Sequence, residues 1–392
     1  MGDQRFFRNT SLEVNRRLDP IPEEVDDSTT ASVLLRQPKK FKSFTVSSLF
    51  IEDLAGICVG TGTLLIKVAA LLQKIKNPQL EKASFDDFTV IGLLGTGAFG
   101  LVLKVLHKKT NTHCAMKVQS KKYIVTVKNQ IRRLMNERNL LAATDFVLIV
   151  KLLFCFKDNA NVYFILELMP CGDFFELKER RRKTPFNEDE ARFYTGQVLL
   201  TFEYLHTAKI AFRDLKPENL LVAVNGYLKL TDFGYAKPLT NVTYTFCGTP
   251  EYMAPEVFTR RGYGVSVDWW AVGILIYEIL FGRTPFADEA TYKIYKRVRN
   301  DDVDFPKQVS KNASSIMMKL LIKDPMSRLG VQQNGAESVK QHPWFSSISW
   351  LALYERRYPP PVEPQKLEAQ PFNMEKLDRS DVMLFEKEFE KF

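Results

Sequence analysis

The stretch FRDLKPENLL at 212–221 decides the fold of this 392-residue chain. It brings Asp214, Lys216 and Asn219 together in one short polar segment. TDFG at 231–234 follows, so that Asp232 comes 18 residues after Asp214. Three more motifs stand downstream in order: CGTPEYMAPE at 247–256, DWW at 268–270 and DPMSRLG at 324–330. Several motifs that occur together in a fixed order identify a class of protein far more specifically than any one motif alone.

Upstream, GTGAFGLV at 95–102 lies between two strand-like runs. Glycines in such a turn let backbone N–H groups approach phosphate oxygens without an intervening Cβ. A similar stretch, GTGTLL at 60–65, has Leu65 in place of the third glycine and lacks flanking strands. We therefore expect one phosphate loop, at 95–100, and interpret the earlier copy as the start of a helix.

Lys117 lies in the centre of an apolar strand-like run, HCAMKV. A buried lysine needs a charged partner, and Glu137 in the next predicted helix is the candidate. The alternative is that both are unrelated surface residues.

Composition limits the class of protein. The chain is 45% hydrophobic with net charge +9, which is compatible with a nucleic acid, a membrane surface or no specific partner. The densest basic run, KERRRK at 178–183, is interpreted as a solvated helix face, with a phosphate or partner patch as the alternative. Five cysteines without a CxxC pair argue against a disulfide framework, and no histidines stand at metal spacing.

The chain divides into parts by composition. Residues 1–53 are predicted to be a flexible extension without a secretory signal, so a cytoplasmic or nuclear location is expected. Residues 54–84 are predicted to form an amphipathic docking helix and linker. A membrane-surface helix and a membrane span are the alternatives. Strand-like runs then extend from 88 to 168, interrupted by a helix near 127–143, and amphipathic helices dominate beyond 173.

Together these motifs resemble the eukaryotic protein kinase family over about 88–345. The resemblance implies an α+β bilobal fold, with a β-rich small lobe at 88–168 and a mainly helical large lobe at 172–345, within a kinase domain of 85–345. The remaining residues, 346–392, look like the C-terminal tail of the AGC group. Within that group, motifs such as FCGTPEYMAPE and the terminal FEKF are similar to the catalytic subunits of cAMP-dependent kinases.

The resemblance implies ATP and Mg²⁺ as cofactors and assigns roles by motif. Asp214, Lys216, Lys117 and Glu137 would be catalytic, and Asn219 and Asp232 would hold the metal. The nucleotide would lie against the glycine loop, the first strands, the segment between the lobes and the tail, at Gly95, Thr96, Gly97, Ala98, Phe99, Gly100, Val102, Ala115, Lys117, Glu167, Met169 and Phe372. The tail PFNM at 371–374 lacks the tyrosine usual in the family, so Phe372 stands there without it.

Substrates and regulation are implied in the same way. Asp173, Glu218 and Glu278 would bind arginines two and three residues before the target Ser or Thr. Phe246, Pro250 and Met253 would line an apolar pocket for the residue after it. Thr245 and Ser380 would be phosphorylated.

The expected partners are basic protein substrates and a separate cAMP-binding regulatory subunit, with neither nucleic acid nor membrane contact. An AGC kinase not controlled by cAMP and a pseudokinase scaffold are the alternatives.

Overall fold

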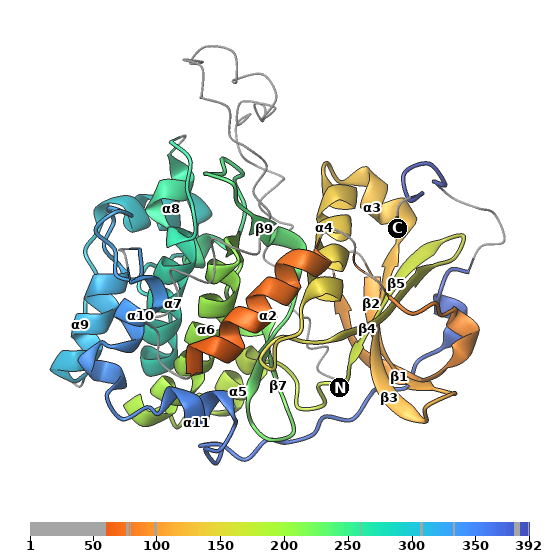
Figure 1. The fold of residues 1–392 in the computed structure, drawn as a ribbon, viewed down its shortest axis with the longest axis horizontal. Coiled ribbons are helices and arrows are strands. Elements are labelled where there is room, and N and C mark those ends of the chain that lie inside the picture. The colour runs from red at the N-terminus through yellow and green to blue at the C-terminus, as the bar shows by residue number, and fades with distance from the viewer. Residues whose placement is uncertain are drawn as a thin grey trace, which may run out of the picture.

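The computed structural model describes residues 60–75, 78, 80–97, 100–259, 261–305, 309–331, 334–379, 385–390 and 392. The predicted extension at 1–53 and the predicted site residues Ala98, Phe99 and Ser380 lie outside the described residues. The described part has two lobes, one built around a β-sheet and one mainly helical (Figure 1).

The small lobe is a five-stranded antiparallel sheet in the order β1-β2-β3-β5-β4. Its strands are β1 (Phe88–Gly97), β2 (Gly100–His107), β3 (Thr112–Ser120), β4 (Leu152–Lys157) and β5 (Asn161–Glu167). The predicted strand-like runs are confirmed, because alternating side chains pack on opposite faces of the sheet. Ala115 and Phe164 belong to the core shared with the large lobe, whereas Met116 and Ile165 belong to a separate cluster on the outer face.

Two helices lie between β3 and β4, where the sequence predicted one at about 127–143. They are the short α3 (Lys121–Thr126) and α4 (Gln130–Ala143). Asn129 between them has φ of 63°, in the left-handed region that asparagine tolerates better than most residues. This conformation ends the first helix and starts the second, and no periodicity in the sequence reveals it.

The large lobe is helical, as the amphipathic pattern predicted. Its helices are α5 (Phe174–Arg180), α6 (Glu188–Thr207), α7 (Ser266–Phe281), α8 (Thr291–Asn300), α9 (Lys311–Leu320), α10 (Gly335–Lys340) and α11 (Trp350–Tyr354). The helix α7 is apolar on all sides and is buried along most of its length, as expected for the central helix of a lobe. Four short strands near the lobe interface carry the motif loops: β6 (Ile210–Ala211), β7 (Leu220–Val222), β8 (Leu228–Leu230) and β9 (Lys237–Pro238).

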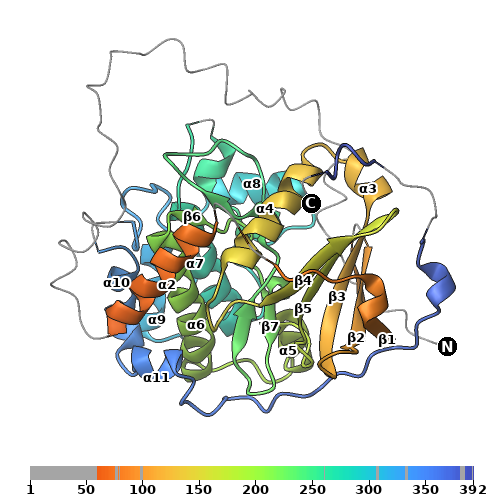
Figure 2. The ribbon, with the colours of Figure 1, turned by 45° about the vertical axis from the view of Figure 1, so that its right-hand side comes forward.

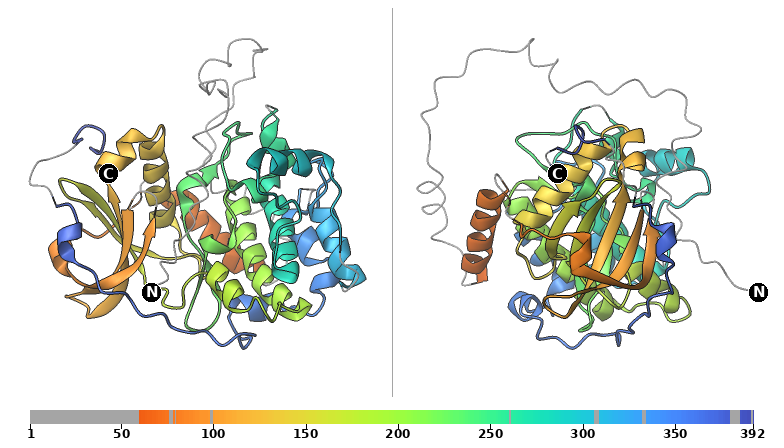
Figure 3. Two further views of the ribbon diagram at one scale, coloured as in Figure 1. Left: turned by 180° about the vertical axis from the view of Figure 1, so that it is seen from behind. Right: turned by 90° about the vertical axis from the view of Figure 1, so that its right-hand side faces the viewer.

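The earlier glycine-threonine-glycine copy does begin a helix, α2 (Gly60–Lys74), which lies along the outside of the molecule against α4 and α6 (Figure 3). Val68 and Leu71 are buried, and Leu64 and Ile75 pack against the same core. The predicted docking face is therefore confirmed. No helix in the described part of the chain combines the length and apolarity that crossing a membrane requires.

The tail runs from α11 back across both lobes, and the C-terminus lies near α3 and α4 (Figure 2). The backbone of Leu367 donates to Pro170 O at 2.7 Å, between the lobes. Gln370 then exchanges two backbone hydrogen bonds with Leu93 of β1, at 2.7 and 2.8 Å. Phe389 is fully buried on the small lobe. The tail therefore contacts the connection between the lobes and the strand that leads into the glycine loop.

Candidate active site

The structure pairs Lys117 of β3 with Glu137 of α4 at 2.7 Å, and only 5% of Glu137 is exposed. The alternative of two unrelated surface residues is therefore excluded. Burial by itself lowers the pKa of Lys117, but the carboxylates of Glu137 and Asp232 outweigh it and hold the pKa above its usual range. The Lys117 ammonium stays charged, between one carboxylate of the small lobe and one of the large lobe.

Asp214 lies after β6 and just before the 3₁₀ turn η3 (Pro217–Asn219). Its Oδ2 accepts a hydrogen bond from Asn219 Nδ2 at 3.0 Å and lies 3.6 Å from Lys216 Nζ, while its Oδ1 accepts from Thr249 Oγ1 at 3.0 Å. Burial raises the pKa of Asp214 to about 6, and Lys216 limits the rise. At neutral pH this carboxylate is ionised, yet close enough to its pKa to accept a proton.

Asp268 holds the segment before Asp214 in place, and sequence reasoning gave it no role. Its carboxylate accepts from the backbone N–H groups of Phe212 and Arg213 at 2.9 and 2.8 Å and contacts His206 Nε2 at 2.7 Å. Arg213 has φ of 70°, a conformation that needs such support. The DWW motif was the available signal, but its partners lie more than fifty residues away in sequence.

Asn219 and Asp232 are brought together, because Thr231 N donates to Asn219 O at 3.0 Å. The amide nitrogen of Asn219 is held by Asp214, which leaves its carbonyl oxygen as a ligand. Burial raises the pKa of Asp232, but Lys117 and Lys216 outweigh this and lower it, so that the carboxylate is ionised. One carboxylate oxygen and one amide oxygen fit the oxygen coordination that Mg²⁺ prefers. Phosphate oxygens and water would complete the coordination shell. No cluster of three or more His, Cys, Asp or Glu ligands occurs among the described residues.

The glycine loop is the hairpin between β1 and β2, in which Gly97 pairs with Gly100 and Gly95 pairs with Val102. A Cβ on Gly100 would lie 1.7 Å from the carbonyl oxygen of Val118, so only glycine fits there. Val102 pairs with Lys117 across the strands, and Ala115 shares their face. Val102, Ala115 and the half-buried Met169 belong to the hydrophobic core between the lobes. Thr96 is exposed near the tip of β1.

Two predicted nucleotide residues have other contacts. The Glu167 carboxylate, at the end of β5, binds Lys229 Nζ of β8 at 2.7 and 2.8 Å and accepts from Lys151 N at 2.8 Å. Its side chain is therefore committed to holding the connection between the lobes. Phe372 packs in the outer-face cluster, on the side of the sheet away from Val102 and Ala115, so the structure does not place it in the nucleotide site.

The activation segment, the stretch between the TDFG motif and the CGTPEYMAPE motif, brings Thr243 and Thr245 side by side, with their hydroxyl oxygens 3.3 Å apart. Thr243 is buried and contacts Lys237 Nζ at 3.1 Å and Arg213 Nη1 at 3.5 Å. The half-buried Thr245 stands beside this cationic pair. Arg133 of α4 lies over the ring of Tyr235, 4.7 Å from its centroid. A phosphate on Thr245 would find cations from both lobes within this cluster.

The three carboxylates predicted for substrate arginines lie in different settings. Asp173 is buried and caps α5, accepting from Glu176 N at 2.8 Å. Burial, aided by Glu176 and Glu218, raises the pKa of Asp173 to about 7. Glu278 is buried and is bound by Lys178 and by the Tyr252 hydroxyl. Glu218 is half-buried and has no salt-bridge partner within the described part of the chain.

The basic run at 178–183 is a solvated face only in part. Glu179, Arg180, Arg182 and Lys183 are exposed, but Lys178 pairs with Glu278 and Arg181 pairs with Glu190 at 2.5 Å. The prediction was wrong for those two residues, because their partners come from other helices. The predicted apolar pocket has Phe246 exposed, Pro250 half-buried and Met253 buried, with the Phe246 ring 6.0 Å from that of Tyr295.

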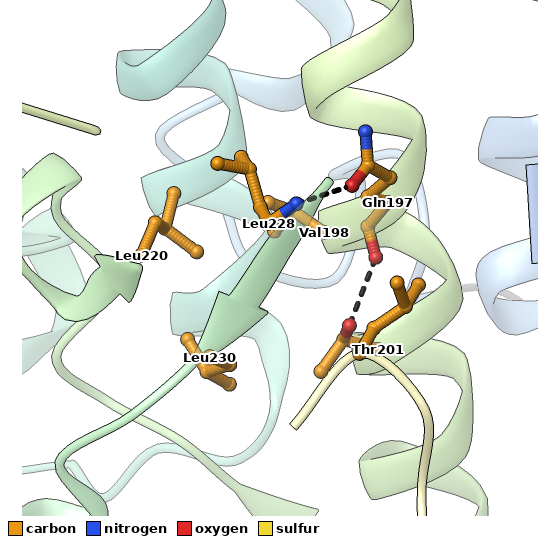
Figure 4. Close-up of a pocket in the computed structure, with 7 residues that line it drawn as sticks. Gln197, Val198, Thr201, Leu220, Leu228 and Leu230 are labelled. Carbon is orange, nitrogen blue, oxygen red and sulfur yellow. Dashed lines mark hydrogen bonds between the residues drawn. The ribbon is translucent and has the colours of Figure 1, made fainter. Parts of the chain in front are cut away.

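A small internal cavity, lined by none of these residues, lies between α6 and the β7–β8 hairpin (Figure 4). Leucines form most of its wall, and its polar groups are already paired: Gln197 Oε1 accepts from Leu228 N at 2.7 Å, and Thr201 Oγ1 donates to Gln197 O at 2.9 Å. We interpret it as a packing defect of the core and not as a ligand site.

Comparison with known proteins agrees with this geometry. Residues 88–345 match the protein kinase domain family. The chain is 39% identical over 282 residues to the cAMP-dependent protein kinase catalytic subunit PRKX of Mus musculus, covering 72% of this chain and 79% of the relative. It is 36% identical over 362 residues to cAMP-dependent protein kinase type 3 of Saccharomyces cerevisiae, covering 91% of this chain and 84% of the relative. A RAC family serine/threonine-protein kinase homolog of Dictyostelium discoideum is 40% identical over 299 residues, covering 75% of this chain and 66% of the relative.

The chain therefore belongs to the protein kinase family and is a serine/threonine protein kinase. Within the family it belongs with the AGC kinases and is similar to the catalytic subunits of cAMP-dependent protein kinases.

Proposed function

We propose that this kinase transfers the γ-phosphate of ATP to serine or threonine in arginine-containing protein substrates. The observation that carries the proposal is that the carboxyl groups of Asp173, Glu218 and Glu278 lie close enough to influence one another's pKa, with Glu218 also influenced by Lys216. Ionised carboxylates are the natural partners of guanidinium groups, which they bind through two parallel hydrogen bonds. Glu218 stands four residues after Asp214, so an arginine bound there lies close to the reacting group.

The residues divide the chemistry between them. The substrate hydroxyl oxygen attacks the γ-phosphorus, the bond from that phosphorus to the β–γ bridging oxygen breaks, and the hydroxyl proton passes to Asp214. Lys117, oriented by Glu137, would hold the α- and β-phosphates, and Lys216 would steady the transferred group. Mg²⁺, held by Asn219 and Asp232, would neutralise the phosphate charge.

The glycine loop, including Ala98 and Phe99, would cover the phosphates, and Val102, Ala115 and Met169 would surround the adenine. We further propose that residues 85–345 form the catalytic domain and 346–392 its tail. Phosphorylation of Thr245 would order the activation segment through the cationic cluster of Arg213, Lys237 and Arg133, and Ser380 would be a second phosphorylation site.

A separate cAMP-binding subunit is the proposed regulator, supported by the names of two relatives. The alternative, an AGC kinase not controlled by cAMP, is favoured by the similarity to a RAC family kinase. A pseudokinase scaffold is disfavoured, because the set formed by Lys117, Glu137, Asp214, Asn219 and Asp232 is complete.

A peptide library tests substrate choice. Purified protein, ATP and Mg²⁺ should select arginine two or three residues before the target, and replacing it with citrulline should weaken phosphorylation. Equal rates with arginine and citrulline would contradict the proposed substrate class. Adding a cAMP-binding regulatory subunit, with and without cAMP, tests regulation. We expect the subunit to inhibit phosphorylation and cAMP to relieve the inhibition. No inhibition would favour an AGC kinase that is not controlled by cAMP.

A further inference from the structure

We propose that Lys178 occupies one of the carboxylate subsites for substrate arginine, so that this kinase favours substrates with a single essential arginine. The inference rests on the proposed function and narrows its substrate class. Lys178 lies in the last turn of α5 and Glu278 near the end of α7, a hundred residues apart in sequence.

Both oxygens of the Glu278 carboxylate are already used. Lys178 Nζ donates to Oε1, and the hydroxyl of Tyr252 donates to Oε2. The side chains of Lys178 and Glu278 are only 9% and 11% exposed. An arginine gains most from a carboxylate whose negative charge no other cation already neutralises. At Glu278 the Lys178 ammonium already neutralises that charge, so a substrate guanidinium must displace the lysine or bind beside a second positive charge.

The Lys178 ammonium is held by more than the carboxylate. The ring centroid of Phe175, on the same helix, lies 5.8 Å from Nζ, within the range of a cation–π contact. A substrate cation that takes its place exchanges one positive charge for another, so the net gain is small.

The other two carboxylates differ in availability. Asp173 is buried at the start of α5 and bonded to the helix backbone. Glu218 has no cation within salt-bridge distance among the residues that the structure describes. A first substrate arginine therefore gains most at Glu218, and a second gains little while Lys178 fills its subsite. The favoured substrates are Ser/Thr segments with one well-placed arginine.

The test uses four peptides that share one sequence and have arginine at both, either or neither of the positions two and three residues before the target. In the wild-type kinase, adding the second arginine should raise kcat/KM by less than about threefold. In Lys178→Met, which keeps the length of the side chain and removes its charge, the same addition should raise kcat/KM by at least about tenfold, because no cation then neutralises Glu278.

Lys178→Arg should restore the wild-type pattern, and Lys293→Met, which removes an exposed lysine of α8, should leave it unchanged. If adding the second arginine raised kcat/KM by the same factor in wild type and in Lys178→Met, the inference would be overturned. If Lys178→Met unfolds, the double variant Lys178→Met/Glu278→Gln keeps the test open. Its buried pair is neutral, and it should show the wild-type second-arginine effect; a gain of tenfold or more would overturn the inference. If no variant distinguishes the arginine-containing peptides from the peptide without arginine at these positions, the proposed substrate class itself fails, which is a separate outcome.

Discussion

Replacing Arg328 with methionine should destabilise the large lobe strongly. The Arg328 side chain is fully buried and donates to both oxygens of Glu256, at 2.5 and 2.8 Å. It also donates to the carbonyl oxygens of Ser266 and Ile322, at 2.9 and 3.0 Å. Methionine fills much of the volume but leaves Glu256 with the Ser266 hydroxyl, at 3.0 Å, as its remaining donor among these groups.

Removing one partner of a buried ion pair costs about 3–5 kcal/mol, because the other charge is left uncompensated. For a lobe of this size that corresponds to a fall in Tm of about 6–20 °C. Denaturant unfolding, followed by circular dichroism, measures the free energy. Arg299→Met, at an exposed position of α8, is the matched control and should change stability by less than about 0.5 kcal/mol.

The double variant Arg328→Met/Glu256→Gln separates this explanation from a simple loss of packing. Because neither charge remains, it should be less destabilised than the sum of the two single variants. If Arg328→Met lowered stability by less than about 1 kcal/mol, or if the two changes were additive, the buried pair would not stabilise the large lobe in the way described.

Three further predictions concern substrate selectivity, the nucleotide and the tail. Because the pKa of Asp173 is raised to about 7, its carboxylate is neutralised as pH falls from 8 to 6. The ratio of kcat/KM for an arginine peptide to kcat/KM for its citrulline counterpart should therefore fall over that range. Asp173→Asn should remove this pH dependence. Lys229→Gln breaks the pair with Glu167 and should raise the KM for ATP about fivefold with little change in kcat, whereas an unchanged KM would show that this pair does not position the nucleotide. A Cβ on Gly92 would lie 2.6 Å from the Gln370 carbonyl oxygen, so Gly92→Ala should detach the tail and speed hydrogen exchange at the Leu93 and Gln370 amides; unchanged exchange would contradict this contact.

The two lobes could be predicted from the sequence, and so could the residues that the structure brings together at the candidate active site. Strand alternation in 88–168 and the motif at 212–221 predict a sheet-based lobe beside a helical one, and ordered motifs located Lys117, Asp214 and Asp232. Each strand pattern and each motif is local in the chain, so a pattern of adjacent residues records it.

Features that depend on distant partners could not be predicted. Lys178 belongs to a basic run whose charge pattern predicts a solvent-exposed helix face, yet it pairs with Glu278 of α7. Asp268 supports the segment before Asp214 through backbone N–H groups, which carry no sequence signal. Phe372 lies on the outer face of the sheet because the tail reaches the small lobe from that side. In each case tertiary contact overrides what the neighbouring residues suggest.

The central claim is that Asp214 accepts the proton of a substrate hydroxyl during transfer from ATP, and one measurement tests it most directly. Wild type, Asp214→Asn and the exposed control Asp189→Asn are compared for phosphorylation of the same arginine-containing peptide, with ATP binding measured in parallel. Asp214→Asn should lower kcat by about 10²–10⁴-fold while ATP still binds, and Asp189→Asn should match wild type. Phosphorylation by Asp214→Asn at the wild-type rate would contradict the account.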